Sequence, residues 1–216
     1  MKTIQECRLY GILDLGYVDH GGIEKMTVEM IRGGIDVIQL RAKGFSPSQV
    51  AEMAAEILPM TREAGVPFIV NDYPEVAATV GADGVHVGQD DLPIREVRAI
   101  VGDAMLVGRS THSLEQARGA AAEPADYIGF GPLFATPTKP DYVPIGTSEI
   151  AAVHREHPDL PIFCIGGIKR ENIRDLLACG ARRVVIVSGI LHAADVTGYV
   201  RDVKAMLREA DGAGGE

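Results

Sequence analysis

Short apolar stretches recur from one end of the chain to the other, and a segment with helical periodicity follows most of them. Each stretch is a nearly continuous apolar run and not an alternation of apolar and polar residues, which is typical of a parallel strand covered on both faces. The expected strands are Cys7–Leu13, Asp36–Leu40, Pro67–Val70, Gly84–Val87, Met105–Val107, Tyr127–Phe130, Ile162–Ile165 and Val184–Val187. Strands that alternate with helices in this way predict a parallel sheet.

The intervening segments support this interpretation. Residues Pro47–Glu63 place Val50, Met53 and Ile57 on one helical face, and Ser46 is available as the N-cap. Further helices are expected at Glu149–Glu156, Glu171–Ala178 and Val196–Ala210, with weaker patterns before residue 35 and between residues 92 and 104. Eight strands that alternate with about eight helices predict an α/β fold, a single (β/α)8 TIM barrel.

The barrel is expected to span residues 1–209, and the Gly-rich residues 210–216 are expected to form a flexible C-terminal tail. An open doubly wound sheet is the alternative architecture. It is disfavoured because no G-x-G-x-x-G motif follows the first expected strand.

Composition excludes several classes of function. The 216 residues include 30 acidic and 21 basic side chains, for a formal charge of −9. A nucleic-acid partner is therefore not expected, because it needs a basic face, whereas a small anion can be held by a few local cations.

No apolar run approaches the roughly 20 residues of a membrane span, and the polar start does not resemble a secretory signal. Three cysteines without CxxC spacing predict reduced thiols. We expect a cytoplasmic protein; its oligomeric state is open, and a homo-oligomer is one option.

Polar residues cluster directly after the expected strands, on the side where barrel enzymes keep their active sites. Such clusters follow seven of the strands. They would all meet at one rim of the barrel, which is difficult to explain by packing alone. Their members include Gln39, Arg41 and Lys43; Asn71 and Asp72; Gln89, Asp90 and Asp91; Ser110, Thr111 and His112; Thr136, Thr138 and Lys139; Gly166 and Gly167; and Ser188 and Gly189.

Gln39, Arg41 and Lys43 alternate at the end of one strand and therefore share its inward face. A structural ion pair plus a surface lysine would explain a lone basic residue. Two cations and an amide at one mouth instead suit a diphosphate, because arginine offers a planar fork and lysine a compact charge.

Asp72 and Asp91 follow neighbouring strands. Either residue alone could cap the helix that comes next. Together, opposite Arg41 and Lys43, they predict a magnesium site, since Mg²⁺ favours one or two carboxylates together with substrate phosphate oxygens and water. Asp90 is expected to be solvated.

A second anion site is expected from the loop over residues 131–146 and from the glycines after the last two strands. A rigid surface loop and tight turns are the alternatives. Loops after strands seven and eight of a barrel often hold phosphate through backbone N–H groups, which favours Gly167 and Ser188 as ligands. His154 and His157 are expected on a solvated helix face and not at a metal site. Cys164 and Cys179 occupy ordinary positions for small apolar residues.

Seven segments resemble thiamine phosphate synthases in order and spacing, from about the first strand to about residue 192. These are QLRAK (39–43), VND (70–72), GADGVHVGQDDLP (81–93), STHS (110–113), YIGFGPLFATPTK (127–139), IGGI (165–168) and VVIVS (184–188). The sequence departs from the family pattern at Tyr73, where arginine is usual. At Arg109, before Ser110, it resembles the sequences of a related branch, the thiazole tautomerases.

The resemblance implies an Mg²⁺-dependent transferase that condenses hydroxymethylpyrimidine diphosphate with hydroxyethylthiazole phosphate and releases diphosphate, through a dissociative carbocation mechanism. It implies catalytic roles for Arg41, Lys43, Ser110 and Lys139. Matched to the pyrimidine diphosphate are Gln39, Arg41, Lys43, Asn71, Ser110 and Lys139; to magnesium, Asp72 and Asp91; to the thiazole phosphate, Thr136, Thr138, Gly167, Val187 and Ser188.

Two alternatives remain within this architecture. One is a thiazole tautomerase, which needs no magnesium and generally lacks the paired aspartates. The other is a catalytically silent barrel that binds thiamine precursors. The presence of Lys43, Asp72 and Asp91 favours the synthase over both.

Overall fold

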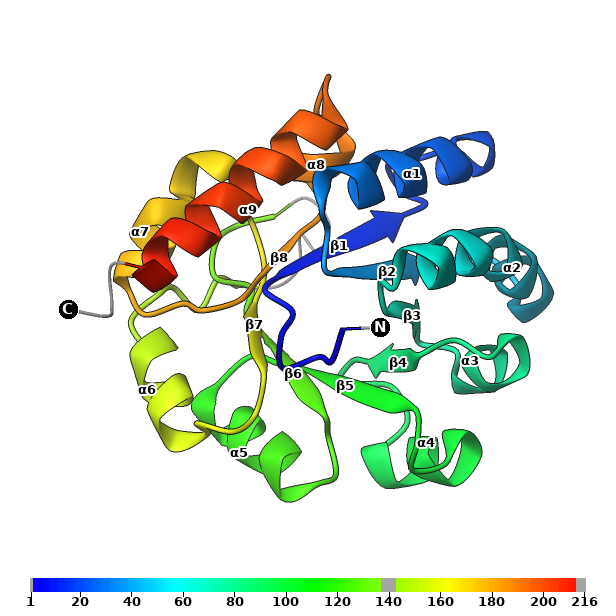
Figure 1. Cartoon of the computed structure of the whole chain (residues 1–216). Coiled ribbons are helices and arrows are strands. Elements are labelled where there is room, and N and C mark those ends of the chain that lie inside the picture. The colour runs from blue at the N-terminus through cyan, green and yellow to red at the C-terminus, as the bar shows by residue number, and fades with distance from the viewer. Residues whose placement is uncertain (1, 137–142, 213–216) are drawn as a thin grey trace.

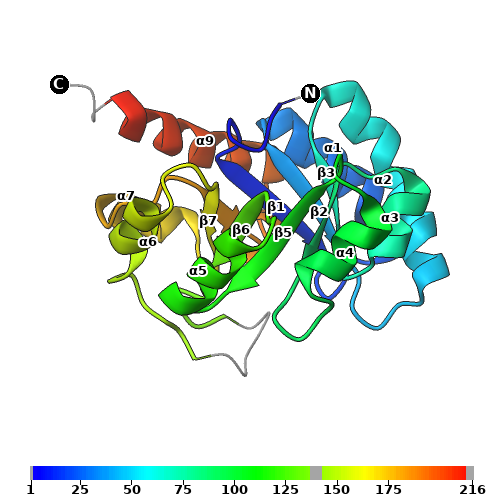
Figure 2. The same cartoon turned by 90° about the horizontal axis from the view of Figure 1, so that it is seen from below.

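The computed structural model describes residues 2–136 and 143–212, with side chains described up to residue 210. In this part of the chain, eight parallel strands close into a barrel in sequence order, and the helices form a surrounding layer (Figures 1 and 2). The TIM barrel predicted from the sequence is therefore confirmed. The strands are β1 (Leu9–Asp14), β2 (Val37–Arg41), β3 (Phe68–Asn71), β4 (Gly84–Val87), β5 (Leu106–Thr111), β6 (Tyr127–Phe130), β7 (Ile162–Cys164) and β8 (Val184–Ile186).

The helical layer begins with the short 3-10 helix η1 (His20–Gly22), and a second one, η2 (Arg170–Asn172), precedes α7. The α-helices are α1 (Ile23–Gly33), α2 (Pro47–Ala64), α3 (Pro74–Val80), α4 (Ile94–Val101), α5 (Leu114–Ala122), α6 (Ile150–Glu156), α7 (Ile173–Ala178), α8 (Ser188–Leu191) and α9 (Val196–Gly212). Ser46 caps α2 as expected, in a capping box with Gln49. No helix in the described ranges has the length and apolarity needed to cross a membrane.

Strand β5 is longer than the sequence predicts. The expected strand ends at Val107, whereas the ladder with β6 continues through Arg109, Ser110 and Thr111. Ladder hydrogen bonds use only the backbone, so polar side chains at the mouth of the barrel do not end the strand. As a result, Ser110 lies on a rigid strand and not in the loop that follows it.

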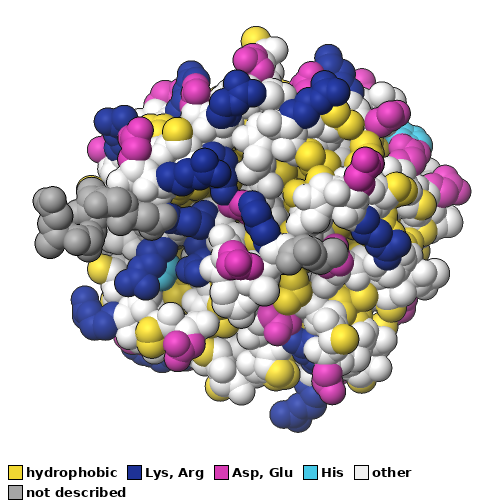
Figure 3. Space-filling model, in the orientation of Figure 1, with side chains coloured by type: hydrophobic (Ala, Val, Ile, Leu, Met, Phe, Trp, Pro, Cys, Tyr) yellow, Lys and Arg dark blue, Asp and Glu magenta, His cyan; other side chains and the backbone are white. Residues whose placement is uncertain are grey.

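The barrel interior is closed at the end where the strands begin. Ile4 and Cys7, from the segment that precedes β1, pack on the interior cluster that contains Tyr10, Tyr127 and Phe163. Figure 1 shows this N-terminal segment crossing the end of the barrel. Gly108 leaves room for one of these rings, because a Cβ at this position would lie 2.2 Å from the Tyr127 ring. The outer face of this end carries both acidic and basic side chains, with hydrophobic ones scattered among them (Figure 3).

Three aspartates tie neighbouring strands together at the same end of the barrel. Each directly precedes an even-numbered strand, and its carboxylate accepts a backbone N–H at the start of the strand before it. The pairs are Asp36 with Leu9, Asp83 with Phe68 and Asp126 with Val107. Before β8 this position is Arg183, and the register of β7 with β8 is the single pair Cys164 and Val184.

The prediction that His154 lies on a solvated face is wrong. Its side chain is 6% exposed, because it shares the packed face of α6 with Ile150 and Val153. Burial, together with the charges of Arg182 and Arg183, lowers the pKa of His154 to about 4. The charged residues that follow it in the sequence, Arg155 and Glu156, therefore do not indicate its environment.

Candidate active site

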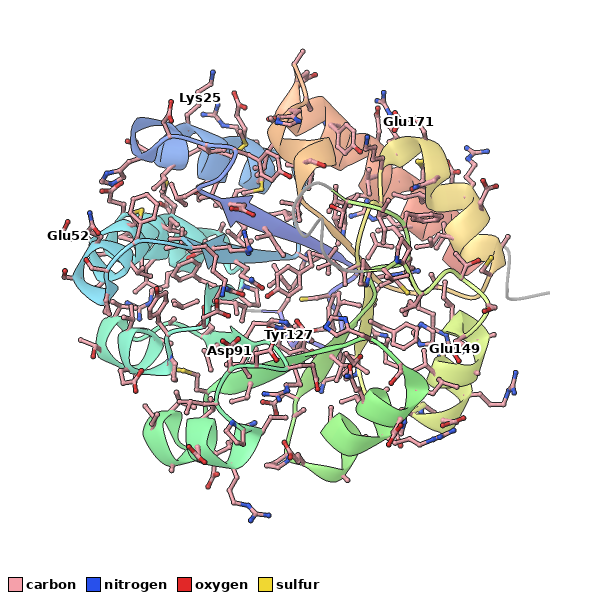
Figure 4. The ribbon with its side chains drawn as sticks, turned by 180° about the vertical axis from the view of Figure 1, so that it is seen from behind. Lys25, Glu52, Asp91, Tyr127, Glu149 and Glu171 are labelled. Atoms are coloured by element: carbon pink, nitrogen blue, oxygen red, sulfur yellow. The ribbon has the colours of Figure 1, made fainter. Side chains whose placement is uncertain are left out.

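A cavity lies at the end of the barrel where the strands finish. Figure 4 shows this end, with Asp91 and Tyr127 near the barrel axis and Lys25, Glu52, Glu149 and Glu171 at the periphery. Eight of the site residues predicted from the sequence line the cavity: Gln39, Arg41, Asn71, Ser110, Thr136, Gly167, Val187 and Ser188. The aromatic side chains of Tyr10, Tyr127 and Phe163 line it as well. The cavity thus combines an apolar wall with a few convergent polar groups, as ligand sites usually do.

Arg41 is held by a carboxylate that the sequence analysis did not select. The Arg41 Nη1 donates to Asp14 Oδ2 at 2.7 Å, and the Asp14 side chain is 2% exposed. Asp14 is the last residue of β1, and its Oδ1 also accepts the backbone N–H of Gly16. An acidic residue at a strand end facing an arginine at the end of the next strand would have been the signal, but it stands alone in its segment.

Lys43, Asp72 and Asp91 form a charged group beside the cavity. The Lys43 ammonium makes an ion pair with the Asp72 carboxylate, and the charge of Asp91 acts on both groups. Burial and the nearby charge of Asp91 raise the pKa of Asp72 in spite of the ion pair. Burial works against the charged form of Lys43, but Asp72 and Asp91 outweigh it and raise the pKa of its ammonium. The group therefore concentrates negative charge next to a cation.

Helix capping does not account for the two aspartates. The N-cap of α3 is Tyr73, and that of α4 is Pro93, with no side-chain cap at either helix. Asp72 has a positive φ of 65°, an uncommon conformation that aspartate tolerates better than most residues. Asp91 Oδ2 instead accepts the Gly88 N–H at 2.6 Å, which orders the loop after β4.

Two of the departures from the family pattern, Tyr73 and Arg109, hold loops around this charged group. The Tyr73 hydroxyl donates to the Phe45 carbonyl at 3.0 Å and so ties the loop after β2 to α3. Arg109 donates to the carbonyl oxygens of Leu92, at 2.9 Å, and Gln89. Both side chains thus support the segments that carry Lys43 and Asp91.

Glycines form the opposite side of the cavity. Gly166 and Gly167 have φ values of 95° and 65°, and a Cβ on Gly167 would lie 2.6 Å from the Cβ of Phe134. The loops after β6 and β7 are joined by backbone hydrogen bonds from Leu133 to Ile165, 2.9 Å, and from Phe134 to Gly166, 3.1 Å. This pairing places Thr136 at the cavity wall with Gly167.

Thr138 and Lys139 lie outside the described residues. Among the residues that the structure describes, no group of three or more His, Cys, Asp and Glu side chains could hold a metal ion.

Comparison with known proteins agrees with this geometry. The family model described as thiamine monophosphate synthase matches residues 9–190. The thiamine-phosphate synthase of Shouchella clausii is 43% identical over 94% of this chain and 97% of its own. That of Pelotomaculum thermopropionicum is 45% identical over 96% and 95%.

Solved structures give the same result. The thiamine phosphate pyrophosphorylase from Pyrococcus furiosus superposes with a TM-score of 0.85 at 29% identity, over 96% of this chain and 98% of that one. The 3-hexulose-6-phosphate synthase from Salmonella typhimurium, 18% identical with a TM-score of 0.72, shares the fold alone. These matches make the protein an enzyme of the transferase class. With more than two thirds of its length matched by the family model, the chain belongs to the thiamine monophosphate synthase family.

Proposed function

We propose that the protein condenses 4-amino-2-methyl-5-hydroxymethylpyrimidine diphosphate with 4-methyl-5-(2-hydroxyethyl)thiazole phosphate to give thiamine phosphate and diphosphate. The observation that carries the proposal is that cationic side chains and glycine loops meet at one cavity, which supports two anion sites there. Arg41 and the Lys43–Asp72–Asp91 group lie on one side, and the glycine loops lie on the other. Relatives named thiamine-phosphate synthase, more than 40% identical over nearly the whole chain, support it.

The diphosphate would bind between Arg41 and Lys43, with Lys139 as a third cation. Arg41 is already oriented by Asp14, so little side-chain entropy is lost when its remaining N–H groups bind an anion. Gln39, Asn71 and Ser110 would contact the pyrimidine, since all three line the cavity next to the aromatic side chains. The thiazole phosphate would bind at Thr136, Thr138, Gly167, Val187 and Ser188.

The donor set suits magnesium. Asp72 and Asp91 are adjacent carboxylates whose mutual repulsion a divalent cation would relieve, and both supply the oxygen ligands that Mg²⁺ prefers. When bound there, Mg²⁺ would supply Lewis-acid stabilisation of the departing diphosphate. Lys43 would exchange its contact with Asp72 for one with a phosphate oxygen.

The proposed mechanism is dissociative. The C–O bond to the diphosphate breaks first and leaves a pyrimidine-stabilised carbocation, which the thiazole nitrogen attacks to form the new C–N bond. No protein nucleophile or strong base takes part. Arg41, Lys43 and Lys139 stabilise the charge that develops on the leaving group, and the cavity positions the acceptor. The closed interior beneath the site keeps bulk water from the cation on that side.

The test is a turnover assay with both substrates, with and without Mg²⁺, in which thiamine phosphate is measured as fluorescent thiochrome. We expect product only with Mg²⁺, and a loss of about 10³-fold or more in Asp91→Ala. Asp90→Ala is the matched control, because Asp90 is the adjacent residue but is exposed. Folded protein that makes no product would overturn the proposal, and thiazole tautomerisation without Mg²⁺ would establish the tautomerase instead.

A further inference from the structure

Six polar side chains form an unbroken hydrogen-bonded chain through the barrel, and each comes from a different strand. The links join Ser110 Oγ to His86 Nε2 (3.0 Å), His86 Nδ1 to Tyr127 Oη (3.3 Å), Tyr127 Oη to Tyr10 Oη (3.1 Å), Tyr10 Oη to Gln39 Oε1 (2.7 Å) and Gln39 Nε2 to Asn71 Oδ1 (2.8 Å). We call these six residues the relay. All of them line the cavity.

The middle of the relay is buried and closely packed. Tyr10 and Tyr127 are each 1% exposed, and Gln39 is 3% exposed. Burial raises the pKa of both phenols, so each keeps its single proton. The Tyr127 ring fits against Gly108, where any Cβ would displace it. Buried hydroxyls in such a setting have to be paired, which makes the order of donors and acceptors a property of the fold.

The direction of every bond follows from one contact. Tyr10 donates to Gln39 Oε1, and because a hydroxyl has one proton, Tyr10 must accept from Tyr127. Tyr127 has then used its own proton, so it accepts from His86 Nδ1–H. In the neutral imidazole the other nitrogen is unprotonated, and His86 Nε2 therefore accepts from the Ser110 hydroxyl.

The two ends of the relay thus face the cavity with opposite character. Ser110 uses its hydroxyl hydrogen to donate to His86 Nε2, so only its oxygen lone pairs remain for a ligand and it is an acceptor. Asn71 Oδ1 is taken by Gln39, and the amide nitrogen of Asn71 is left as the donor. If the Gln39 amide were turned over, every bond would reverse, and both ends would change character.

We propose that the relay selects a ligand ring that carries an amino group beside a ring nitrogen, with Tyr10 and Tyr127 as the positioning residues. The amino group donates to Ser110, and the ring nitrogen accepts from Asn71. An oxo ring with a protonated ring nitrogen has the opposite pattern at both atoms. This inference rests on the proposed function, because it takes the aminopyrimidine diphosphate as the ligand.

The first test needs no ligand. Long-range ¹H–¹⁵N correlation spectra of histidine-labelled protein report which ring nitrogen carries the proton, and His86 is assigned from the signals lost in His86→Asn. We expect the Nδ1–H form in the wild type. In Tyr10→Phe the Tyr127 hydroxyl loses its acceptor and turns to His86 Nδ1, so we expect the Nε2–H form. An Nε2–H form in the wild type, or the same form in both proteins, overturns the relay.

The second test measures specificity by calorimetric titration with the aminopyrimidine diphosphate and with its 4-oxo analogue. The wild type should bind the amino compound about 30-fold more tightly or better, because the oxo ring leaves two buried groups unpaired. Tyr10→Phe and Tyr127→Phe should reduce this ratio by about tenfold. Tyr199→Phe removes a phenol hydroxyl in α9, outside the strands, where it accepts the Arg170 N–H, and should keep the ratio.

The outcomes separate the two proposals. A wild type that binds both compounds equally, or Tyr→Phe variants that keep the full ratio, would overturn the relay and leave the proposed function standing. A wild type that binds neither compound would overturn both. The ratio is compared within each variant, so a general loss of stability does not mimic the expected result.

Discussion

The guanidinium of Arg41 and the carboxylate of Asp14 lie 2.7 Å apart at the mouth of the barrel, on neighbouring strands. This contact fixes the direction in which Arg41 faces the cavity. Replacement of Asp14 by Asn leaves an acceptor for Gly16 but turns an N–H toward the guanidinium. We expect the KM for the pyrimidine diphosphate to rise about tenfold, with a smaller change in kcat. Steady-state kinetics check this, and an unchanged KM would show that Arg41 is not positioned by Asp14.

Asp72→Asn should weaken magnesium activation without disturbing the fold. Asparagine tolerates the positive φ of 65° at this position, whereas alanine would strain it. The amide lacks the negative charge that attracts a cation, and we expect the Mg²⁺ concentration for half-maximal activity to rise about tenfold or more. Titration of activity with MgCl₂ measures this shift. Equal midpoints in the two proteins would argue against Asp72 as a ligand.

Asp36→Asn should destabilise the protein markedly. The Asp36 carboxylate is 1% exposed and binds Lys204 of α9, Lys2 at 2.5 Å and the backbone of β1. Loss of the charge leaves a nearly buried lysine unpaired, and we expect unfolding to need about 3 kcal/mol less. Asp83→Asn is the matched control, since its Oδ2 meets only a backbone N–H in the bonds described and should cost about 1 kcal/mol or less. Urea denaturation gives both values.

Mild acid should destabilise the fold through His154. Its pKa is about 4 when folded, against 6.5 for an ordinary histidine. Between these values the unfolded chain binds a proton that the folded chain does not, so stability is lost as the pH falls from about 6.5 to about 4, by up to about 3 kcal/mol. His154→Leu removes this contribution. Urea denaturation at several pH values should show a flatter profile in the variant, while His20→Gln, an exposed histidine, should keep the wild-type profile.

The sequence predicted the barrel well because parallel strands covered on both faces leave a distinctive apolar pattern. Site residues next to strand ends, such as Gln39 and Ser110, could be found in the same way. Asp14 was missed because its importance depends on Arg41, 27 positions away along the chain. The burial of His154 could not be read from neighbours that are charged. Tertiary packing decides such cases, not local composition.

The relay could not be predicted from the sequence for a related reason. Tyr10 and Tyr127 sit in apolar strands and read as core residues, which they also are. Their hydroxyl groups meet only because β1 and β6 face one another across the closed barrel. Sequence spacing carries information along a strand or helix, and a contact between distant strands leaves no period to detect.

The hydrogen bonds of Asp36, Asp83 and Asp126, at the end of the barrel where the strands begin, join some pairs of neighbouring strands and not others. Their hydrogen bonds join β1 to β2, β3 to β4 and β5 to β6. No aspartate joins β7 to β8 in this way, and these two strands share one register pair. Hydrogen exchange should therefore be fastest, among the strands, along β7 and β8. Gly167 lies in the loop after β7, and Ser188 begins α8 just after β8. The barrel would then be most flexible between β7 and β8, next to the loops proposed to bind the thiazole phosphate. These loops could adjust when the phosphate binds, while the strands proposed to bind the diphosphate stay in place.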